Sequence, residues 1–233
     1  MRVLVTRPQT DAEALTKALL ARGHEVVLEP LLTIEPREAV DWPAGHETAQ
    51  ALLVTSANGL RAFAAADPRR ALPIFAVGDS SAEAGRALGF QAVDSANGDV
   101  SDLAELVKAR LDPGAGPLLH PAASRLAGDL QGDLSAAGFD VLRVVLYDAL
   151  PARTLSAACL REFANGLIDV VTFFSPRTAA AFASLIGKAE LSEACRRVTA
   201  VCLSPAVAAR ISELAWAEVA IAPSPDQAAL LAE

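Results

Sequence analysis

Small polar residues collect in six short turns, each directly after an apolar run that the sequence predicts to be a strand. The turns are Thr6-Arg7-Pro8, Thr55 to Gly59, Gly78 to Ser81, His120-Pro121, Ser175 to Thr178 and Ser204-Pro205. At the carboxyl ends of parallel strands such turns open into helix N-termini, whose N–H groups bind anions. Each turn alone is equally typical of helix capping, with Pro176 and Pro205 at first helical positions. Together they predict a site that binds carboxylates through backbone donors, without a basic surface.

The sequence carries no motif of a familiar catalytic or cofactor site. Its three histidines, His24, His46 and His120, are scattered, and no spacing of His, Cys, Asp or Glu resembles a zinc or di-iron site. The glycine motifs that bind ATP or dinucleotides and the nucleophile elbow of esterases are also missing. Only His120 stands at a predicted strand end, where it is a candidate ligand contact. The residues by themselves therefore do not name a reaction.

The elements that position these turns alternate along the chain. Short β-branched or apolar runs alternate with Ala/Leu-rich amphipathic stretches, a pattern that predicts parallel sheets covered by helices on both faces. A helix is predicted over Asp11 to Ala21 and ends before Gly23, which accepts the left-handed conformation of a helix end. Strands are predicted at residues 2–6, 25–29, 51–55, 73–77, 91–94, 117–120, 140–147, 169–174, 198–202 and 218–221.

Three pairs of segments indicate a duplicated unit. Residues 51–65 resemble residues 170–184 at an offset of 119, with Ser56 matching Ser175. Residues 74–82 resemble residues 198–206 at an offset of 124, with Ser80 matching Ser204. The opening of the chain resembles residues 118–142. Because that third match comes after the second unit has begun, the two halves do not simply follow each other.

This order predicts a chain that starts one α/β domain, builds a whole second domain, and returns to finish the first. We expect the first domain to comprise residues 1–34 and 151–233 and the second residues 37–148. The crossings are expected near residues 31–37 and 143–151, where apolar, β-branched stretches end at prolines as a two-stranded connector would.

Composition and charge narrow the classes of function. With 233 residues, 52% of them hydrophobic and 21% charged, the chain is too apolar for disorder and long enough for a core without disulfides. A net charge of −8 without a Lys/Arg run argues against nucleic acid. Cys159, Cys195 and Cys202 form no C-x-x-C pair, and the opening apolar run is too short for a signal peptide or membrane span. We therefore expect a cytoplasmic protein that does not bind membranes.

In order and spacing, the motifs of this chain resemble the uroporphyrinogen-III synthase family over essentially its full length. The matching stretches are VLVTRP followed by G-x-x-V, VTSANGLRAF, FAVGDSSA, R-x-x-G-D-L with AAGFDV from Arg125 to Val141, VVLYDAL, TFFSPRTAAAF and APSPDQAALL. The resemblance implies two flavodoxin-like, three-layer α/β domains with parallel sheets, joined by a two-stranded β connector, with the active site in the cleft between them.

The resemblance also implies the reaction. Linear hydroxymethylbilane loses the hydroxyl of ring A to give an azafulvene, which the substituted carbon of ring D attacks. The resulting spiro intermediate fragments and recloses as uroporphyrinogen III, a step of haem biosynthesis. No metal or organic cofactor is implied. Because the bilane closes unaided to the symmetrical isomer, the protein's task is to hold the conformation that favours the other closure.

Site residues follow from the matching motif positions. Tyr147, the chain's one tyrosine, is the expected catalytic residue, whose phenol would donate a proton or hydrogen bond to the departing hydroxyl. The expected substrate-binding residues are Arg7, Ser56, Asn58, Gly78, Ser81, Arg125, Ser175, Arg177 and Ser204. Two departures from the family pattern affect carboxylate binding: Val201-Cys202-Leu203 lacks the glycine of its turn, and His120-Pro121 replaces an arginine and glycine.

Two other classes of function stay open on the sequence alone. A two-domain sensor or regulator of an anionic small molecule would use the same turns without catalysis. A structural interaction module would need an exposed apolar stripe, which the helical patterns do not indicate. For the synthase we expect a monomer whose partners are the linear tetrapyrrole and the upstream bilane-forming enzyme.

Overall fold

The chain forms two compact units. The computed structural model describes residues 1–125, 128–224 and 226–232. One unit comprises Met1–Thr33 and Leu150–Glu233, and the other comprises Ile34–Ala149. The first unit is thus built from both ends of the sequence. Residues 126 and 127 of the motif from Arg125 to Val141, and residue 225 of the last motif, lie outside the described part.

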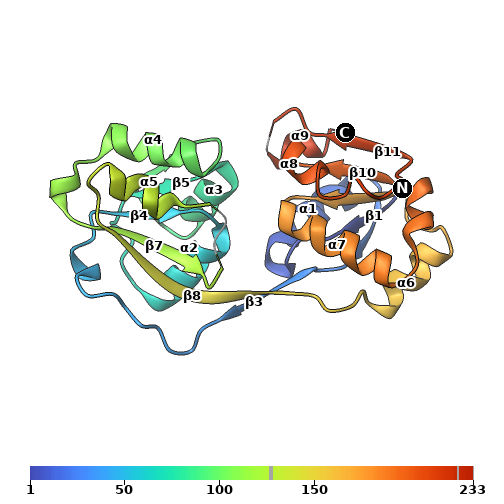
Figure 1. Ribbon diagram of the computed structural model, residues 1–233, viewed down its shortest axis with the longest axis horizontal. Coiled ribbons are helices and arrows are strands. Elements are labelled where there is room, and N and C mark those ends of the chain that lie inside the picture. Colours follow the sequence, from blue (N-terminus) through green and yellow to red (C-terminus); the bar gives the residue numbers. More distant parts are fainter. Residues whose placement is uncertain (126–127, 225, 233) are drawn as a thin grey trace. The chain divides into compact units, whose positions relative to one another are not determined.

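The first unit contains a parallel sheet of five strands in the order β11-β10-β9-β1-β2 (Figure 1). The central strands are almost wholly buried because they are apolar on both faces, whereas the edge strands β2 and β11 keep exposed residues. The strands are β1 (Arg2–Val5), β2 (Glu25–Leu28), β9 (Val170–Phe173), β10 (Thr199–Cys202) and β11 (Glu218–Ile221).

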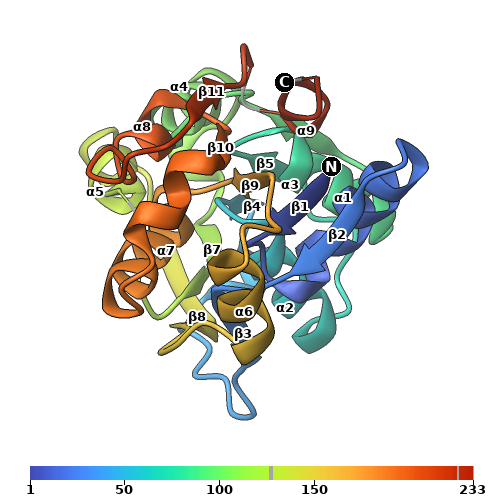
Figure 2. The same cartoon turned by 90° about the vertical axis from the view of Figure 1, so that its right-hand side faces the viewer.

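Helices cover both faces of this sheet, and β1 shows how the sequence divides between them. Val3 and Val5 pack against α1 (Gln9–Ala21), while Leu4 points into a larger core with α6 (Ala157–Ala164) and α7 (Pro176–Lys188). Figure 2 shows α1 and α7 on opposite sides of the strands. The larger core holds Phe163, Phe173, Phe182 and all three cysteines. The remaining helices are α8 (Pro205–Ala208), α9 (Gln227–Leu230) and the 3-10 turn Ser192–Arg197.

Glu29 joins the two sequence-distant parts of the first unit. Its carboxylate is 6% exposed and accepts hydrogen bonds from Ser156 N at 2.8 Å and Ser156 Oγ at 2.5 Å. Ser156 in turn caps α6, accepting a bond from Cys159 N at 3.1 Å. The end of β2 is thereby fixed to the segment by which the chain returns.

The second unit contains a six-stranded sheet in the order β3-β8-β7-β4-β5-β6. Its strands are β3 (Leu32–Pro36), β4 (Ala51–Val54), β5 (Ile74–Ala76), β6 (Val93–Ser95), β7 (Leu118–Ala123) and β8 (Val141–Pro151). Along β4, Leu52 and Val54 face α2 (Ala57–Ala66) and α3 (Asp79–Ala87), and Ala51 and Leu53 face the opposite core. That core contains α4 (Val100–Arg110) and α5 (Leu130–Ala136); 3-10 turns span His46–Thr48 and Pro113–Ala115.

β3 and β8 carry the two crossings, and they run antiparallel (Figure 1). Arg37 N donates to Leu146 O at 2.9 Å, while Ala152 N donates to Leu31 O at 3.0 Å. Residue numbers therefore rise along β3 as they fall along β8, as in an antiparallel pair. Arg37 Nε also lies 3.0 Å from Asp148 Oδ2, and this bond lowers the pKa of Asp148.

The two sheets have the same strand order, and this order confirms the flavodoxin-like fold. In the first unit the chain fills its sheet in the order 2-1-3-4-5. The second unit has the same order when β7 and β8 are counted as its first two strands, so its chain begins at the third strand. This is the permutation that the order of the sequence matches predicted.

The strand registers confirm one repeat offset and correct another. β4 and β9 begin and end 119 residues apart, as expected. Val77 N donates to Val54 O and Leu203 N donates to Phe173 O, so Val77 matches Leu203 at an offset of 126. The expected offset of 124 is wrong by two residues, because similar Ala and Ser residues pair in either alignment. Ser204 therefore matches Gly78 rather than Ser80.

All ten predicted strands are present, and the largest errors are in length. β7 runs to Ala123 instead of ending at His120, although it contains Pro121. The strand tolerates this proline because β4 pairs with β7 only at Leu118 and Leu119. β8 continues to Pro151 because β3 extends the sheet beside it.

Candidate functional site

In the first unit, Arg7 lies at the carboxyl edge of the sheet, directly after β1. Thr6, fully buried, fixes the strand end by donating from Oγ1 to Thr172 O of β9 at 2.8 Å. The Arg7 guanidinium then lies 4.2 Å from the Phe174 ring centroid and donates to Gln227 Oε1 of α9 at 3.3 Å. Arg7 is half-buried and held from two sides, so its charge is fixed near the edge.

Ser175 begins α7 at the same edge, and its hydroxyl is occupied by capping. Ser175 Oγ accepts a bond from Thr178 N at 3.2 Å and lies 3.0 Å from Thr178 Oγ1. Since the Thr178 hydroxyl donates to Ser175 O at 3.0 Å, the Ser175 proton goes to Thr178 Oγ1. Pro176 occupies the first turn as predicted, and Arg177 is half-buried beside it. The edge thus offers the N-terminus of a 13-residue helix and two arginines.

Ser204 precedes α8 at the third strand end of this unit. It occupies the N-cap position, with Pro205 in the first turn as predicted, but its side chain makes no capping bond. Because α8 has only four residues, we assign no anion site to its N-terminus alone.

In the second unit, Ser56 and Asn58 open α2 after β4. Ser56 Oγ accepts a bond from Asn58 N at 3.1 Å, which leaves the hydroxyl proton of Ser56 for another acceptor. Asn58 Oδ1 accepts a bond from Arg61 Nη1 at 2.8 Å. Ser56 is therefore a better hydroxyl donor to a ligand than its repeat partner Ser175.

Gly78 and Ser81 open α3 after β5. Gly78 has an extended backbone with φ −159°, which any residue adopts, and a Cβ built there would meet nothing within 4 Å. Its repeat partner Ser204 does carry a side chain, so the fold does not require glycine here. Ser81 is 7% exposed, which places its hydroxyl largely out of reach of solvent.

Tyr147 lies in β8 opposite Ala123, next to a register shift between Ala122 and Ala123. It is 5% exposed and packs into the core that contains α2 and α3. A Cβ on Gly59 would lie 2.5 Å from Pro121 O and 3.7 Å from Tyr147 Cε1. Glycine at this position therefore lets the first turn of α2 approach β7 and the tyrosine ring.

His120, which is buried, and Arg143, which is half-buried, are neighbours on adjacent strands. They are register partners in β7 and β8, and His120 Nε2 lies 3.1 Å from Thr55 Oγ1. Burial, helped by the charge of Arg143, lowers the pKa of His120 from 6.5 to about 4. His120 Nδ1 and Arg143 Nε are buried without a hydrogen-bond partner among the described residues. His120 is 2% exposed, so it supports the site from beneath rather than facing a ligand.

Arg143 fixes the loop that carries Arg125. Its Nη2 donates to Ala123 O at 2.7 Å and to Ser124 O at 2.8 Å, directly before Arg125. Arg125 itself is exposed on a bend after β7. Sequence reasoning missed Arg143 and Gly59, although a single charge in the apolar run VLRVV was a signal that this arginine has a buried partner.

The thiols and acids of the described residues offer no evident nucleophile or metal cluster. Burial raises the pKa of Cys159 to about 12 and the pKa values of Cys195 and Cys202 to about 11, so the three thiols stay protonated. In residues 1–125, 128–224 and 226–232, no three His, Cys, Asp or Glu side chains gather as metal ligands would. What each unit does present is the helix N-termini and arginines described above, which suit the binding of carboxylates.

Fold and site together define a class: two doubly wound α/β units, one permuted, each with anion-accepting turns at the carboxyl edge of its sheet. A sequence model described as uroporphyrinogen-III synthase HemD matches residues 13–232, so the chain belongs to the uroporphyrinogen-III synthase family.

Solved structures share this fold at low sequence identity. The uroporphyrinogen-III synthetase of Helicobacter pylori is 16% identical, with a TM-score of 0.66 over 100% of this chain and 97% of that one. A mutant uroporphyrinogen III synthase of Thermus thermophilus is 20% identical, with a TM-score of 0.57 over 94% of this chain and 92% of that one. No curated protein sequence matches significantly. In the part of the chain that the structure describes, we find no helix with the length and hydropathy of a membrane span.

Proposed function

We propose that this chain catalyses the reaction of its family, closing hydroxymethylbilane to uroporphyrinogen III with loss of water and inversion of ring D. The observation that carries the proposal is the family match over residues 13–232. The two flavodoxin-like units agree with it. None of the comparisons supports the alternative of a non-catalytic sensor.

This chemistry needs no protein nucleophile, since ring D of the substrate attacks the azafulvene that forms on ring A. The protein must donate a proton or hydrogen bond to the hydroxyl, which leaves as water, and hold the bilane so that the substituted carbon of ring D reaches the azafulvene before the spontaneous closure occurs. Cysteines with raised pKa values are consistent with such a mechanism, because none of them is poised to attack.

We assign carboxylate binding to the turns at both sheet edges. In the first unit the N-terminus of α7, Arg7 and Arg177 would hold acetate and propionate groups. In the second unit the Ser56 hydroxyl, Asn58 and the turns around Gly78 and Arg125 would do the same. Three further serines would contribute chiefly through the backbone N–H groups of their turns: Ser81, Ser175 and Ser204. The Ser81 side chain is buried, and the hydroxyl proton of Ser175 is engaged with Thr178.

We assign the departing hydroxyl to Tyr147. Its ring lies beside the first turn of α2, where Gly59 allows close approach, and packs into the buried core of this unit. A fixed phenol donates a hydrogen bond without first being ordered, which favours the transition state over the ground state.

We also propose that the protein acts as a monomer in the cytoplasm and receives its substrate from the upstream bilane-forming enzyme. Light scattering after size-exclusion chromatography should give the mass of one 24.2 kDa chain. A stable dimer at working concentrations would contradict the monomer.

The direct test is to add purified protein to freshly generated hydroxymethylbilane, oxidise the products and separate the isomers. We expect mainly isomer III, with spontaneous isomer I in the control without protein. Isomer I alone in both samples would refute the proposed activity. A heat-unfolded sample of the same protein serves as the matched control.

A further inference from the structure

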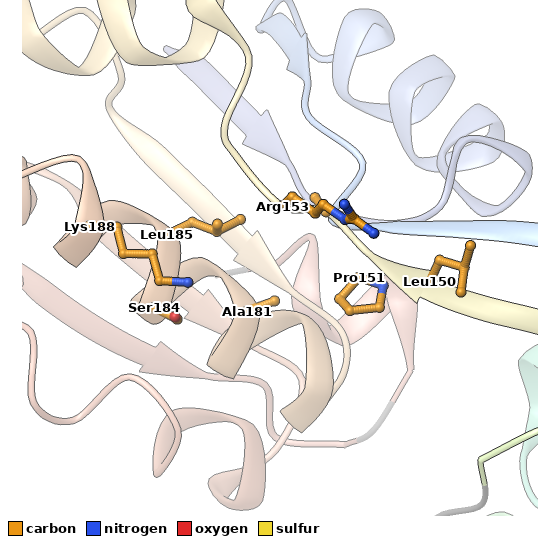
Figure 3. Close-up of a pocket in the computed structure, with 8 residues that line it drawn as sticks. Leu150, Pro151, Arg153, Ala181, Ser184, Leu185 and Lys188 are labelled. Atoms are coloured by element: carbon orange, nitrogen blue, oxygen red, sulfur yellow. The ribbon is translucent and has the colours of Figure 1, made fainter.

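A hollow of about 490 Å³ lies on the first unit, away from the strand-end turns. It is lined by Leu150, Pro151, Ala152, Arg153, Ala181, Ser184, Leu185 and Lys188. Leu150 and Pro151 are the last residues of β8, Ala152 and Arg153 follow it directly, and the last four lie beyond the first turn of α7 (Figure 3). Its volume falls within the range of about 300–1,000 Å³ that small-molecule sites occupy.

The floor of the hollow is apolar and packs against the core of this unit. Ala152 and Ala181 pack against the core of this unit, and Leu185 is 5% exposed within that core. Leu150, which also lines the hollow, is 44% exposed. An apolar molecule seated here would cover Leu150 and lie against Leu185.

Two cations flank this floor from different segments. Figure 3 shows the Lys188 ammonium beside Ser184 on one side of Ala181 and Leu185, and Arg153 on the other side. None of the eight lining residues is acidic, although the chain as a whole has a net charge of −8. Lys188 also suits the negative end of α7, but this explains one cation and not the second.

A second hollow on the same unit provides a contrast. It is lined by Gln9, Ala12, Glu13, Thr16, Lys17, Leu20 and Leu28. It too combines leucines with a lysine, but Glu13 supplies a carboxylate beside Lys17. A diacid has no second cation there and meets a like charge.

We propose that the hollow between the end of β8 and α7 is a binding site for a small dicarboxylate with an apolar body. One carboxylate pairs with Lys188 and the Ser184 hydroxyl, the other pairs with the Arg153 guanidinium, and the body covers Leu150 and Leu185. This site goes beyond the proposed cyclisation and does not depend on it, because its test measures binding alone.

The test is methyl NMR on the full chain, titrated with 1,4-phenylenediacetate at millimolar concentrations. We expect the methyl signals of Ala181, Leu185 and Leu150 to shift together and to saturate. The neutral diamide should bind at least tenfold more weakly. Arg153→Gln and Lys188→Gln should each weaken binding of the diacid at least threefold, and the double variant at least tenfold.

Lys17→Gln is the matched control, since it removes one exposed cation from the other hollow. The Lys17→Gln variant should bind the diacid with the same affinity as the unchanged chain. The proposal is overturned if these methyl signals do not move, if the diamide binds as well, or if Lys17→Gln weakens binding as much as Lys188→Gln. Inorganic phosphate is a further probe; if it competes fully at equal concentration, the site recognises charge alone and the proposed apolar body is wrong.

Discussion

At the scale of single residues, the site depends on side chains whose partners restrict what they can do. Ser56 keeps a proton to donate, whereas the Ser175 proton is engaged with Thr178, although the two residues occupy the same place in the repeat. Both were predicted from one serine pattern. The sequence shows Thr178 three residues after Ser175 and Gly59 three residues after Ser56, but it does not show that the Thr178 hydroxyl turns back to Ser175.

Tyr147→Phe removes the phenol oxygen and leaves the ring packed beside Gly59. If the phenol assists departure of the hydroxyl, the rate of isomer III formation should fall by about 10²-fold or more, with little change in KM. Rates from single-turnover assays should be compared with urea unfolding curves, which show whether the variant folds. Full activity in a folded variant would remove Tyr147 from the chemical step.

His120 makes folding stability depend on pH. Its folded pKa of about 4 lies below the ordinary value of 6.5. Between these values the unfolded chain binds a proton that the folded protein does not, so stability falls as the pH falls from about 6.5 to 4, by on the order of 3 kcal/mol at most.

His120→Gln should abolish this part of the pH dependence while keeping an amide near Thr55. The free energy of unfolding by urea, measured at several pH values in this window, gives the slope for both proteins. His24→Gln, a histidine outside this pair, is the control and should retain the slope. An unchanged slope in His120→Gln would show that other groups cause it.

At the scale of elements, the sequence predicted strands and helix starts better than the contacts between them. The ends of β4 and β9 were predictable because these apolar runs stop close to Ser56 and Ser175, which do cap α2 and α7. The offset between the second pair of repeated segments was not predictable from the sequence. Only the hydrogen bonds of Val77 and Leu203 distinguish an offset of 126 residues from one of 124. Likewise, nothing local to Gly59 indicated that β7 passes within contact distance of it.

Gly59→Ala tests how closely α2 approaches β7. The added methyl would lie 2.5 Å from Pro121 O, a backbone atom that cannot rotate away. We expect a loss of about 1–3 kcal/mol in unfolding free energy, larger than the roughly 1 kcal/mol that alanine contributes to a helix. Gly187→Ala is the matched control, since it lies inside α7 with only Ser192 Oγ at 4.0 Å, and its stability should rise by up to about 1 kcal/mol. Equal stability of the two variants would contradict the packing.

At the scale of the whole molecule, a chain of net charge −8 has to bind a bilane with eight carboxylates. Binding must therefore come from local geometry, namely helix N-termini and arginines at the sheet edges, against an unfavourable overall charge. The permuted repeat supplies such an edge in each unit, which explains how a protein without a basic surface can serve this family's reaction.

Two substitutions distinguish the effect of a charge near the substrate from the effect of the net charge: Arg177→Gln and Arg196→Gln. Each changes the net charge from −8 to −9. Arg177 stands in the first turn of α7, whereas Arg196 pairs with Glu193 on an exposed turn. We expect Arg177→Gln to raise KM by about tenfold and Arg196→Gln to leave it unchanged. Equal increases in KM would show that overall charge governs binding.

The central claim is that the chain directs ring closure of the bilane faster than the bilane closes unaided. The most direct measurement is the fraction of isomer III as the protein concentration is raised against a fixed amount of fresh hydroxymethylbilane. The account predicts that this fraction rises in proportion to protein at first and then approaches completion. A fraction of isomer III that stays at the level without protein at every concentration would contradict it.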